Sequence, residues 1–276
     1  MRRALCRKKK GGSEMELPVL SSTANPAVRA MRALEDGKAR RETGCMRLEG
    51  RKLCAEAARE LEVTALFVRE GRAELYADLI AACAQKGARA WAVSDRVLEY
   101  VCAAKTPQDV VLSARIPRLA LRGGPLVALD GVQDPGNLGA IVRTCDAAGF
   151  GGVVLGPGCA DPYAPKSIRA TMGSLLRVPM EKVPDLAAWL SARRDEGRAL
   201  LLTALDGEDF FGRGALPPDP ILVIGSEGRG ISPAVAACAT HRYRLPMAGG
   251  AESLNAAVAA GTMIYDLYRV QRQGES

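Results

Sequence analysis

A chain of 276 residues has room for one large domain or two small ones, and its 48% hydrophobic and 4% aromatic content predicts a mostly aliphatic core. Its apolar runs are all shorter than the roughly 18 residues of a membrane helix, so no membrane partner is expected. The eight cysteines contain no C-x-x-C pair, and the basic start has no apolar signal segment behind it. These features exclude a zinc ribbon and predict free thiols in a reducing cytoplasm.

The net charge of +7 is unevenly placed along the chain. Residues 1–52 hold 14 Lys or Arg and 6 Asp or Glu, whereas the remaining residues are close to neutral. A basic N-terminal part on a neutral body predicts an anionic partner, and nucleic acid is the usual one. For residues 1–16 two interpretations stay open, a disordered solvated tail and an arm that binds the anion.

Residues 17–113 alternate between helical and extended patterns and are predicted to form a small α/β domain. We expect strands at residues 63–70 and 88–94, and helices at residues 25–42, 50–62, 73–87 and 95–102. Residues 114–124 carry Pro117 and two consecutive glycines, which is typical of a linker.

Residues 125–276 are predicted to form a second α/β domain with a parallel sheet. Strands are expected at residues 126–130, 152–156, 177–180, 199–205, 221–226 and 243–247. Helices are expected at residues 137–148, 166–175, 185–196, 233–238 and 253–270. Short apolar strands that alternate with helices indicate a sheet covered on both faces. Such sheets bind ligands beyond the carboxyl ends of their strands.

Three of these strands are followed by segments rich in glycine or small residues. "LVALD" precedes "GVQDPGNLGAIVRT", "ILVIG" precedes "SEGRGIS", and "YRLPM" precedes "AGGAESLNAAVAAG". The first loop is not G-x-G-x-x-G, and Asn137 stands where a P-loop has its lysine, so a nucleoside triphosphate is not the expected ligand. We expect a ligand held by the backbone of several loops, with an adenine among Leu245, Met247 and Leu254.

The glycines and polar residues of these loops have expected local roles. Gly225, Gly228 and Gly230 let the backbone bend tightly or approach a ligand closely. Ser232 before Pro233 is a favourable N-cap, and Glu252 or Ser253 is expected to cap the last helix.

The segments "NLGAIVRT", "IGSEGRGIS" and "LPMAGGAESLNAAVA" resemble, in order, the three motifs of the SpoU/TrmH branch of the SPOUT methyltransferases. The resemblance covers residues 125–270. It implies S-adenosylmethionine as methyl donor, a ribose 2′-hydroxyl in RNA as acceptor, a deep trefoil knot in the sheet, and a homodimer through the C-terminal domain. The residues expected to bind the cofactor are Thr203, Gly225, Ser226, Glu227, Gly228, Leu245, Met247 and Leu254.

The N-terminal part is similar to the RNA-binding domain found on many ribosomal-RNA members of this family. The similarity lies in "SSTANPAVRAMRAL", "RLEGRKLCAEA" and "TPQDVV", with Asp109 where the family usually has glycine. It implies ribosomal RNA as the substrate in preference to tRNA. Candidate contacts to RNA phosphates are Arg29, Arg32, Lys38, Arg40, Arg41, Arg51 and Lys52.

The resemblance implies five catalytic residues: Asn137, Arg143, Glu227, Ser253 and Asn255. Arg143 is expected either as general base or as phosphate anchor, and we favour the anchor because arginine is effectively always protonated. Glu227 is expected to hold Arg143 or a neighbouring loop, and Asn255 to contact Arg143 or the acceptor. Asn137 is expected to orient Arg143 or the ribose. Ser253 is expected to position the substrate. Each residue also has a plain structural interpretation, as a turn residue, a surface residue or a helix cap.

Other polar residues are not expected to be catalytic. His241, the one histidine, belongs to none of the motifs, and the chain has no carboxylate cluster of metal-ligand type, so no metal is expected. Asp130 and Asp134 are expected to shape the turn around Pro135, and Cys145 to lie in the core. Two rival functions stay open, an RNA-binding factor without catalysis and a nicotinamide-dependent oxidoreductase, although the latter lacks the G-x-G-x-x-G loop.

Overall fold

The computed structural model of the chain describes residues 17–102 and 106–274, so the predicted basic tail at residues 1–16 lies outside the described residues. The chain divides into two compact units, Met1–Pro117 with Tyr163–Pro165 and Arg118–Pro162 with Lys166–Ser276. Among the described helices, none is both long and apolar enough to cross a membrane.

The N-terminal unit contains a mixed sheet of five strands in the order β1-β4-β3-β5-β2. Strands β1, β4 and β3 run parallel, and β5 is antiparallel to both β3 and β2. The strands are β1 (Val19–Leu20), β2 (Cys45–Glu49), β3 (Val63–Arg69), β4 (Arg89–Val93) and β5 (Val110–Arg115). The helices are α1 (Pro26–Ala33), α2 (Gly37–Thr43), α3 (Arg51–Glu60), η1 (Ala73–Tyr76), α4 (Ala77–Gln85) and α5 (Asp95–Val101).

The helix predicted at residues 25–42 is in fact two helices. Asp36 caps the second of them, because its side chain accepts a hydrogen bond from the backbone nitrogen of Lys38 at 2.7 Å. The guanidinium of Arg40 donates to the carbonyl oxygens of Leu34 and Glu35, at 2.7 Å each, where α1 ends. The local capping of each segment therefore divides a continuous helical pattern.

The mixed sheet also contains three strands that the sequence pattern did not predict, namely β1, β2 and β5. Strand β2 does not show the alternation of apolar and polar residues that is typical of a strand, because Arg47 is fully buried in it beside Glu49. Strand β5 extends to Arg115, so the linker predicted to begin at residue 114 begins inside a strand. The end of β5 is set by its hydrogen bonds to β2 and β3, which the amino-acid composition of the segment does not reveal.

The C-terminal unit is built on a parallel sheet of six strands, in the order β11-β9-β10-β6-β7-β8, as predicted. Its strands are β6 (Leu126–Asp130), β7 (Gly152–Leu155), β8 (Met180–Lys182), β9 (Leu200–Asp209), β10 (Ile221–Gly225) and β11 (His241–Arg244). Strand β8 begins three residues later than predicted, because the 3-10 turn η2 (Ser174–Leu176) occupies the preceding segment. The trefoil knot stays a prediction.

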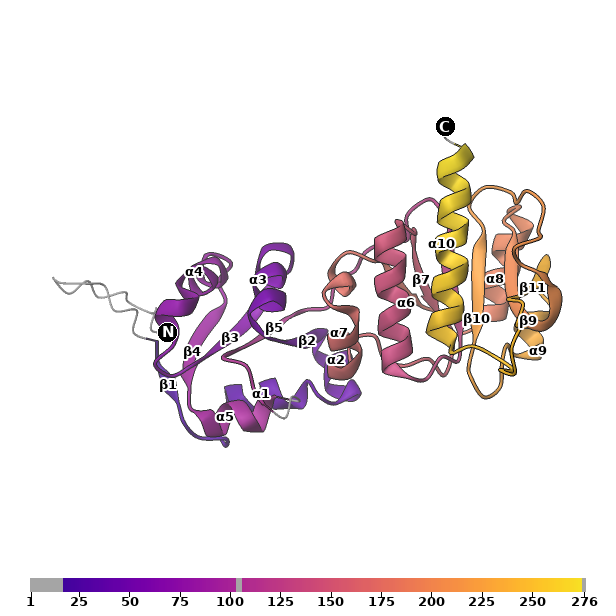
Figure 1. Cartoon of the computed structure of the whole chain (residues 1–276). Helices are drawn as coiled ribbons and strands as arrows, with labels where there is room; N and C mark the ends of the chain where they lie inside the picture. The colour runs from indigo at the N-terminus through magenta and orange to yellow at the C-terminus, as the bar shows by residue number, and fades with distance from the viewer. Residues whose placement is uncertain (1–16, 103–105, 275–276) are drawn as a thin grey trace. The chain divides into compact units, whose positions relative to one another are not determined.

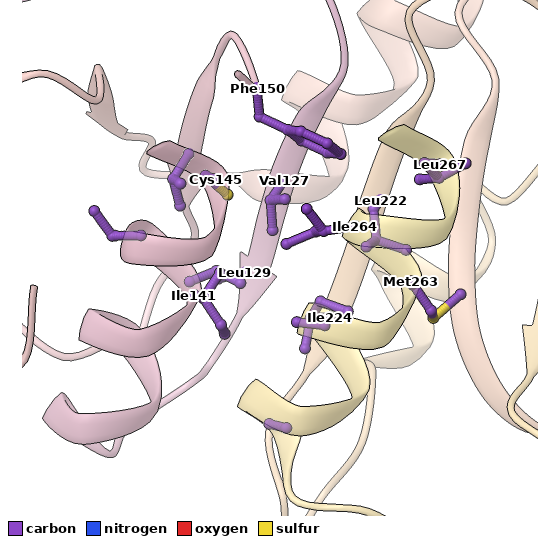
Figure 2. Packing of buried hydrophobic residues seen from close by; sticks show 14 of the residues in the cluster. Val127, Leu129, Ile141, Cys145, Phe150, Leu222, Ile224, Met263, Ile264 and Leu267 are labelled. Carbon is purple, nitrogen blue, oxygen red and sulfur yellow. The ribbon is translucent and has the colours of Figure 1, made fainter. Parts of the chain in front are cut away.

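Helices cover both faces of this sheet. Helices α6 (Pro135–Ala148) and α10 (Ala256–Gly274) lie side by side on one face, which carries the side chains of Val127, Leu129 and Ile224 (Figures 1 and 2). The opposite face carries Leu126 and Ala128 and packs against α8 (Leu186–Asp195) and α9 (Pro233–Ala236). Successive residues of "LVALD" point to opposite faces of the sheet. Because helices cover both faces, the segment is one continuous apolar run.

Helix α7 (Pro165–Thr171) approaches α6 closely at Gly139. A Cβ atom at Gly139 would lie well below 3.0 Å from Ala170, so only glycine fits at this helix crossing. The glycine of "NLGAIVRT" is therefore a packing residue.

A nearly buried ion pair joins Asp266 of α10 to Arg213 in the segment after β9. Arg213 Nη2 lies 2.5 Å from Asp266 Oδ2, and Arg269 Nη2 lies 2.8 Å from Asp266 Oδ1. Burial alone raises the pKa of Asp266, but hydrogen bonds from Arg269 and Arg213 outweigh it and hold the pKa below its ordinary value. This pair therefore stabilises the fold above about pH 4 and loses its effect as the pH falls through the lowered pKa.

We expect Asp266→Asn to lower the free energy of unfolding at pH 7 by about 2 kcal/mol, because it leaves Arg213 with no carboxylate partner. The loss should shrink at about pH 3, because the stabilisation from the pair declines as the pH falls below about 4 towards the lowered pKa. Urea unfolding at both pH values measures the difference. Asp206→Asn is the matched control, since its 2.9 Å pair with Arg242 is exposed and should contribute little. Equal losses for Asp266→Asn at both pH values would contradict the assignment.

Candidate active site

A pocket of about 550 Å³ lies beyond the carboxyl ends of β10 and β11 and beside the middle of β9. Its walls come from residues 203–205, residues 225–230, the end of β11 and the start of α10. This is where parallel sheets bind ligands, and the volume is that of a small-molecule cleft. The eight predicted cofactor-binding residues all line it: Thr203, Gly225, Ser226, Glu227, Gly228, Leu245, Met247 and Leu254.

The loop after β10 closes on itself. Ser226 and Gly230 exchange two backbone hydrogen bonds, at 3.1 Å and 2.9 Å. A Cβ at Gly225 would lie below 3.0 Å from the backbone of Gly230, and Gly230 itself has a φ of 64°. Two of the three glycines are thus required by the loop itself, as expected. A side chain at Gly228 would meet no atom of the chain, so the fold alone does not require that glycine.

We expect Gly225→Ala to lower the free energy of unfolding by about 2 kcal/mol, because backbone atoms must move to admit the methyl group. Gly228→Ala is the matched control for the fold and should melt like the wild type. Thermal unfolding of the two variants tests the difference. The assignment fails if both variants melt alike.

Three of the predicted catalytic residues meet at the rim of this pocket. Asn137 donates a hydrogen bond from its side-chain amide to Glu227 and accepts one from Asn255 Nδ2 at 3.0 Å. Asn137 is free to do so because Asp134, not Asn137, caps α6, accepting from the Asn137 backbone nitrogen at 2.8 Å. The trio joins the turn after β6, the loop after β10 and the start of α10.

Asn255 also replaces the expected cap of α10. Its Oδ1 accepts from the backbone nitrogens of Ala257 at 3.0 Å and Val258 at 3.3 Å, so the prediction of Glu252 or Ser253 as the cap is wrong. The helix begins at Ala256, three residues later than predicted. Ser253 instead lines the pocket as an exposed residue.

Arg143 does not join the trio within one chain. Six residues of helix turn it about 120° away from Asn137 around α6. Its side chain is exposed, it does not line the pocket, and the described residues offer it no hydrogen bond or ion pair. Within the single chain, Glu227 bonds to Asn137 on the neighbouring turn, which is one of the two roles expected for it, and Asn255 bonds to Asn137. Contact of these residues with Arg143, the ribose or the acceptor stays a prediction.

Sequence reasoning missed several pocket residues. Leu205, which is 72% exposed, lies inside β9, at the last residue of the strand predicted there, and no ligand-binding loop was recognised beside that strand. Arg229 and Arg244 also line the pocket and bring positive charge to it. The position of each arginine at a strand end of a parallel sheet is the signal that could have found them.

Other polar residues near the site have structural partners. Asp134 caps α6 and so shapes the turn around Pro135 as predicted, whereas Asp130 accepts from the backbone nitrogen of Ser232 at 2.6 Å and so holds the loop after β10 instead. Cys145 is fully buried in the core. His241 does not line the pocket, and its Nδ1 lies 2.8 Å from the hydroxyl of Thr240. The described residues contain no group of three His, Cys, Asp or Glu side chains that could hold a metal.

The predicted RNA-contacting residues differ in exposure. Arg40 is only 4% exposed and bonds to backbone carbonyls, so it is withdrawn from the set. Arg32 is half-buried, paired with Glu35 and stacked over the ring of Tyr100. The exposed candidates that remain are Arg29, Lys38, Arg41, Arg51 and Lys52.

Comparison with known families agrees with this architecture. The family model described as "SpoU rRNA Methylase family" matches residues 124–265, and the "MRM3-like substrate binding domain" matches residues 25–112. The chain belongs to the SpoU rRNA methylase family. The resemblance predicted for each of the two parts is thereby confirmed.

Relatives with a named activity match most of the chain. The 23S rRNA (guanosine(2553)-2′-O)-methyltransferase of Bacillus subtilis is 30% identical over 249 residues, which are 90% of this chain and 98% of that protein. The 23S rRNA (uridine(2479)-2′-O)-methyltransferase of Streptomyces viridochromogenes is 35% identical over 184 residues, 62% and 64% of the two chains. The AdoMet-bound rRNA methyltransferase of Sinorhizobium meliloti is 32% identical, with a TM-score of 0.82 over 91% of this chain and 97% of that one.

The chain is an S-adenosylmethionine-dependent RNA 2′-O-ribose methyltransferase. The residues of the pocket fit that cofactor. Leu245, Met247 and Leu254 offer apolar contacts for an adenine, and the loop beside Gly228 leaves room for a ligand to approach the backbone. The nicotinamide-dependent alternative is thereby set aside.

Proposed function

We propose that the acceptor is a ribose in ribosomal RNA. The observation that carries this proposal is the trio of Asn137, Glu227 and Asn255 at the rim of the strand-end pocket, in a chain that also has an MRM3-like substrate-binding domain. The relatives named above act on 23S rRNA, which supports the same class of substrate. Because the described cysteines are free thiols, we also propose that the protein works in the reducing cytoplasm.

Each site residue then has a proposed role. When bound, the donor supplies a methyl carbon that is already activated, so the chain must align the acceptor and help its hydroxyl lose a proton. The apolar wall and the loop backbone hold the donor, and Asn137 keeps Glu227 and Asn255 in place beside it. Arg143, being always protonated, anchors an RNA phosphate next to the acceptor ribose. Ser253 is proposed to position the ribose.

We propose further that the active unit is a homodimer through the face of α6 and α10. This face exposes Val258 and Tyr265 of α10, which are 52% and 50% exposed, beside Ala140 and Arg143 of α6. Exposed apolar side chains next to small ones favour a packed interface. A second copy on this face would bring its own Arg143 toward a pocket from which the Arg143 of the same chain is absent.

S-adenosylhomocysteine, the demethylated product of the donor, should stabilise the fold. At about a hundredfold excess over its Kd it should raise the melting temperature by roughly 5–10 °C, whereas NAD⁺ should have no effect. Leu254→Asp should remove the shift. Leu119→Asp is the control, because Leu119 has similar exposure but lies outside the pocket. A shift that survives in Leu254→Asp would place the donor elsewhere.

A further inference from the structure

The N-terminal unit contains a groove of about 350 Å³ between α3 and the segment η1–α4. Small alanine side chains and Leu79 form its apolar lining, and Leu75 at its edge is 52% exposed. Arg51 and Arg59 line it from α3, and Tyr76 and Asp78 from the other side. A shallow apolar cleft with two cations at its edge is suited to a flat ligand that carries negative charge.

Two planar groups are already stacked in this groove. The guanidinium carbon of Arg51 lies 5.5 Å from the centroid of the Tyr76 ring. The Tyr76 hydroxyl donates to Asp109 Oδ2 at 3.3 Å, and Asp109 Oδ1 accepts from Arg69 Nε at 2.6 Å. Burial and the neighbouring Asp109 carboxylate raise the pKa of Tyr76, so the hydroxyl stays protonated and continues to donate. The ring is thus held in a fixed orientation.

Asp109 is the residue that fixes the ring, and its φ is not positive, so the turn itself does not need a glycine at this position. Glycine has no side chain to accept a hydrogen bond from either Tyr76 or Arg69. The orientation of Tyr76 is therefore a property of this sequence.

Resting on the proposed function, we propose that this groove binds one unpaired nucleobase of the RNA substrate, stacked on the Arg51–Tyr76 pair. Paired bases in an A-form duplex hide their faces in the stack, whereas bases of loops and single strands stack on aromatic rings and guanidinium planes. Arg51 and Arg59 face the adjoining phosphates. Asp78 accepts a hydrogen bond from an exocyclic amino group, which favours adenine, cytosine or guanine over uracil.

The test measures binding of the full-length protein to a fluorescent 12-residue oligoadenylate, an oligouridylate of the same length and an RNA hairpin stem. Wild type should bind oligoadenylate most tightly. Tyr76→Leu should weaken that binding roughly tenfold, and Arg51→Lys should also weaken it, because lysine keeps the charge without the plane. Tyr76→Phe, which keeps the ring but loses the hydrogen bond to Asp109, should weaken binding less than Tyr76→Leu does. Tyr100→Leu is the matched control, since Tyr100 also lies under an arginine, Arg32, but outside this groove.

Unchanged oligoadenylate binding by folded Tyr76→Leu overturns the proposal, and so does an equal loss of hairpin binding. Circular dichroism and cooperative thermal unfolding of each variant check that it is folded, because the donor pocket lies in the other unit and its ligand binding does not report on this one. The outcome is separable from the proposed function. If the wild type fails to methylate ribosomal RNA but still needs Tyr76 for oligoadenylate, the proposed acceptor is wrong while the base site stands.

Discussion

Arg143→Ala should lower the rate of methyl transfer to RNA roughly thousandfold, about 4 kcal/mol, while the affinity for the methyl donor stays at the wild-type value. The loss is expected because a fixed positive charge beside the acceptor is removed. Donor affinity should not change, since Arg143 lies outside the pocket. Single-turnover transfer and donor binding, measured on the same preparation, separate the two quantities.

The matched control is Arg194→Ala. Arg194 is exposed on α8, which covers the opposite face of the sheet, and should be dispensable. Mixing two inactive variants, Arg143→Ala and Glu227→Ala, then tests whether Arg143 acts across the dimer. If it does, random pairing restores about a quarter of wild-type activity, because half of the dimers contain one complete site. No recovery would mean that Arg143 serves its own chain, and wild-type activity of Arg143→Ala would remove it from the mechanism.

Asn137→Ala should lower transfer about a hundredfold, since it disconnects Glu227 and Asn255, which both line the pocket. Asn137→Asp should be as inactive, because a carboxylate there would face the carboxylate of Glu227. The melting temperature should change little for Asn137→Ala, because Asp134 supplies the helix cap. Steady-state kinetics with varied donor and RNA concentrations measure the effect.

The control for this pair is Gln133→Ala, an exposed change on the same turn that leaves the trio intact. If Asn137→Asp were as active as the wild type, the hydrogen bond from Asn137 to Glu227 would have no part in transfer. If Asn137→Ala instead lost its cooperative unfolding, its role would be structural.

The sequence was most informative where local pattern and tertiary structure agree. The runs around Val127 and Ile224 are apolar because both faces of a parallel sheet are covered. The strands, and the loops that follow them, could therefore be predicted. The donor pocket followed from the rule that ligands bind at strand ends. Leu205 was not predicted to line the pocket, because it lies inside β9 and nothing in the residue itself indicates a site.

The sequence was least informative where contacts between distant segments decide. From the sequence, Arg40 was predicted to be a surface cation. In the structure its guanidinium donates to the backbone carbonyls of Leu34 and Glu35, where α1 ends. Asn137 and Arg143 stand in one motif, yet the helical turn between them points them apart. The link between Asn137 and Glu227 spans 90 residues, and no periodicity of either segment encodes it.

The most direct test is transfer of a labelled methyl group from S-adenosylmethionine to unmodified ribosomal RNA, followed by alkaline hydrolysis. A methyl group on the ribose 2′-oxygen blocks cleavage of the next phosphodiester, so we predict that the label stays in an alkali-resistant dinucleotide. Label released in a mononucleotide would mean methylation of a base and would contradict the ribose as acceptor.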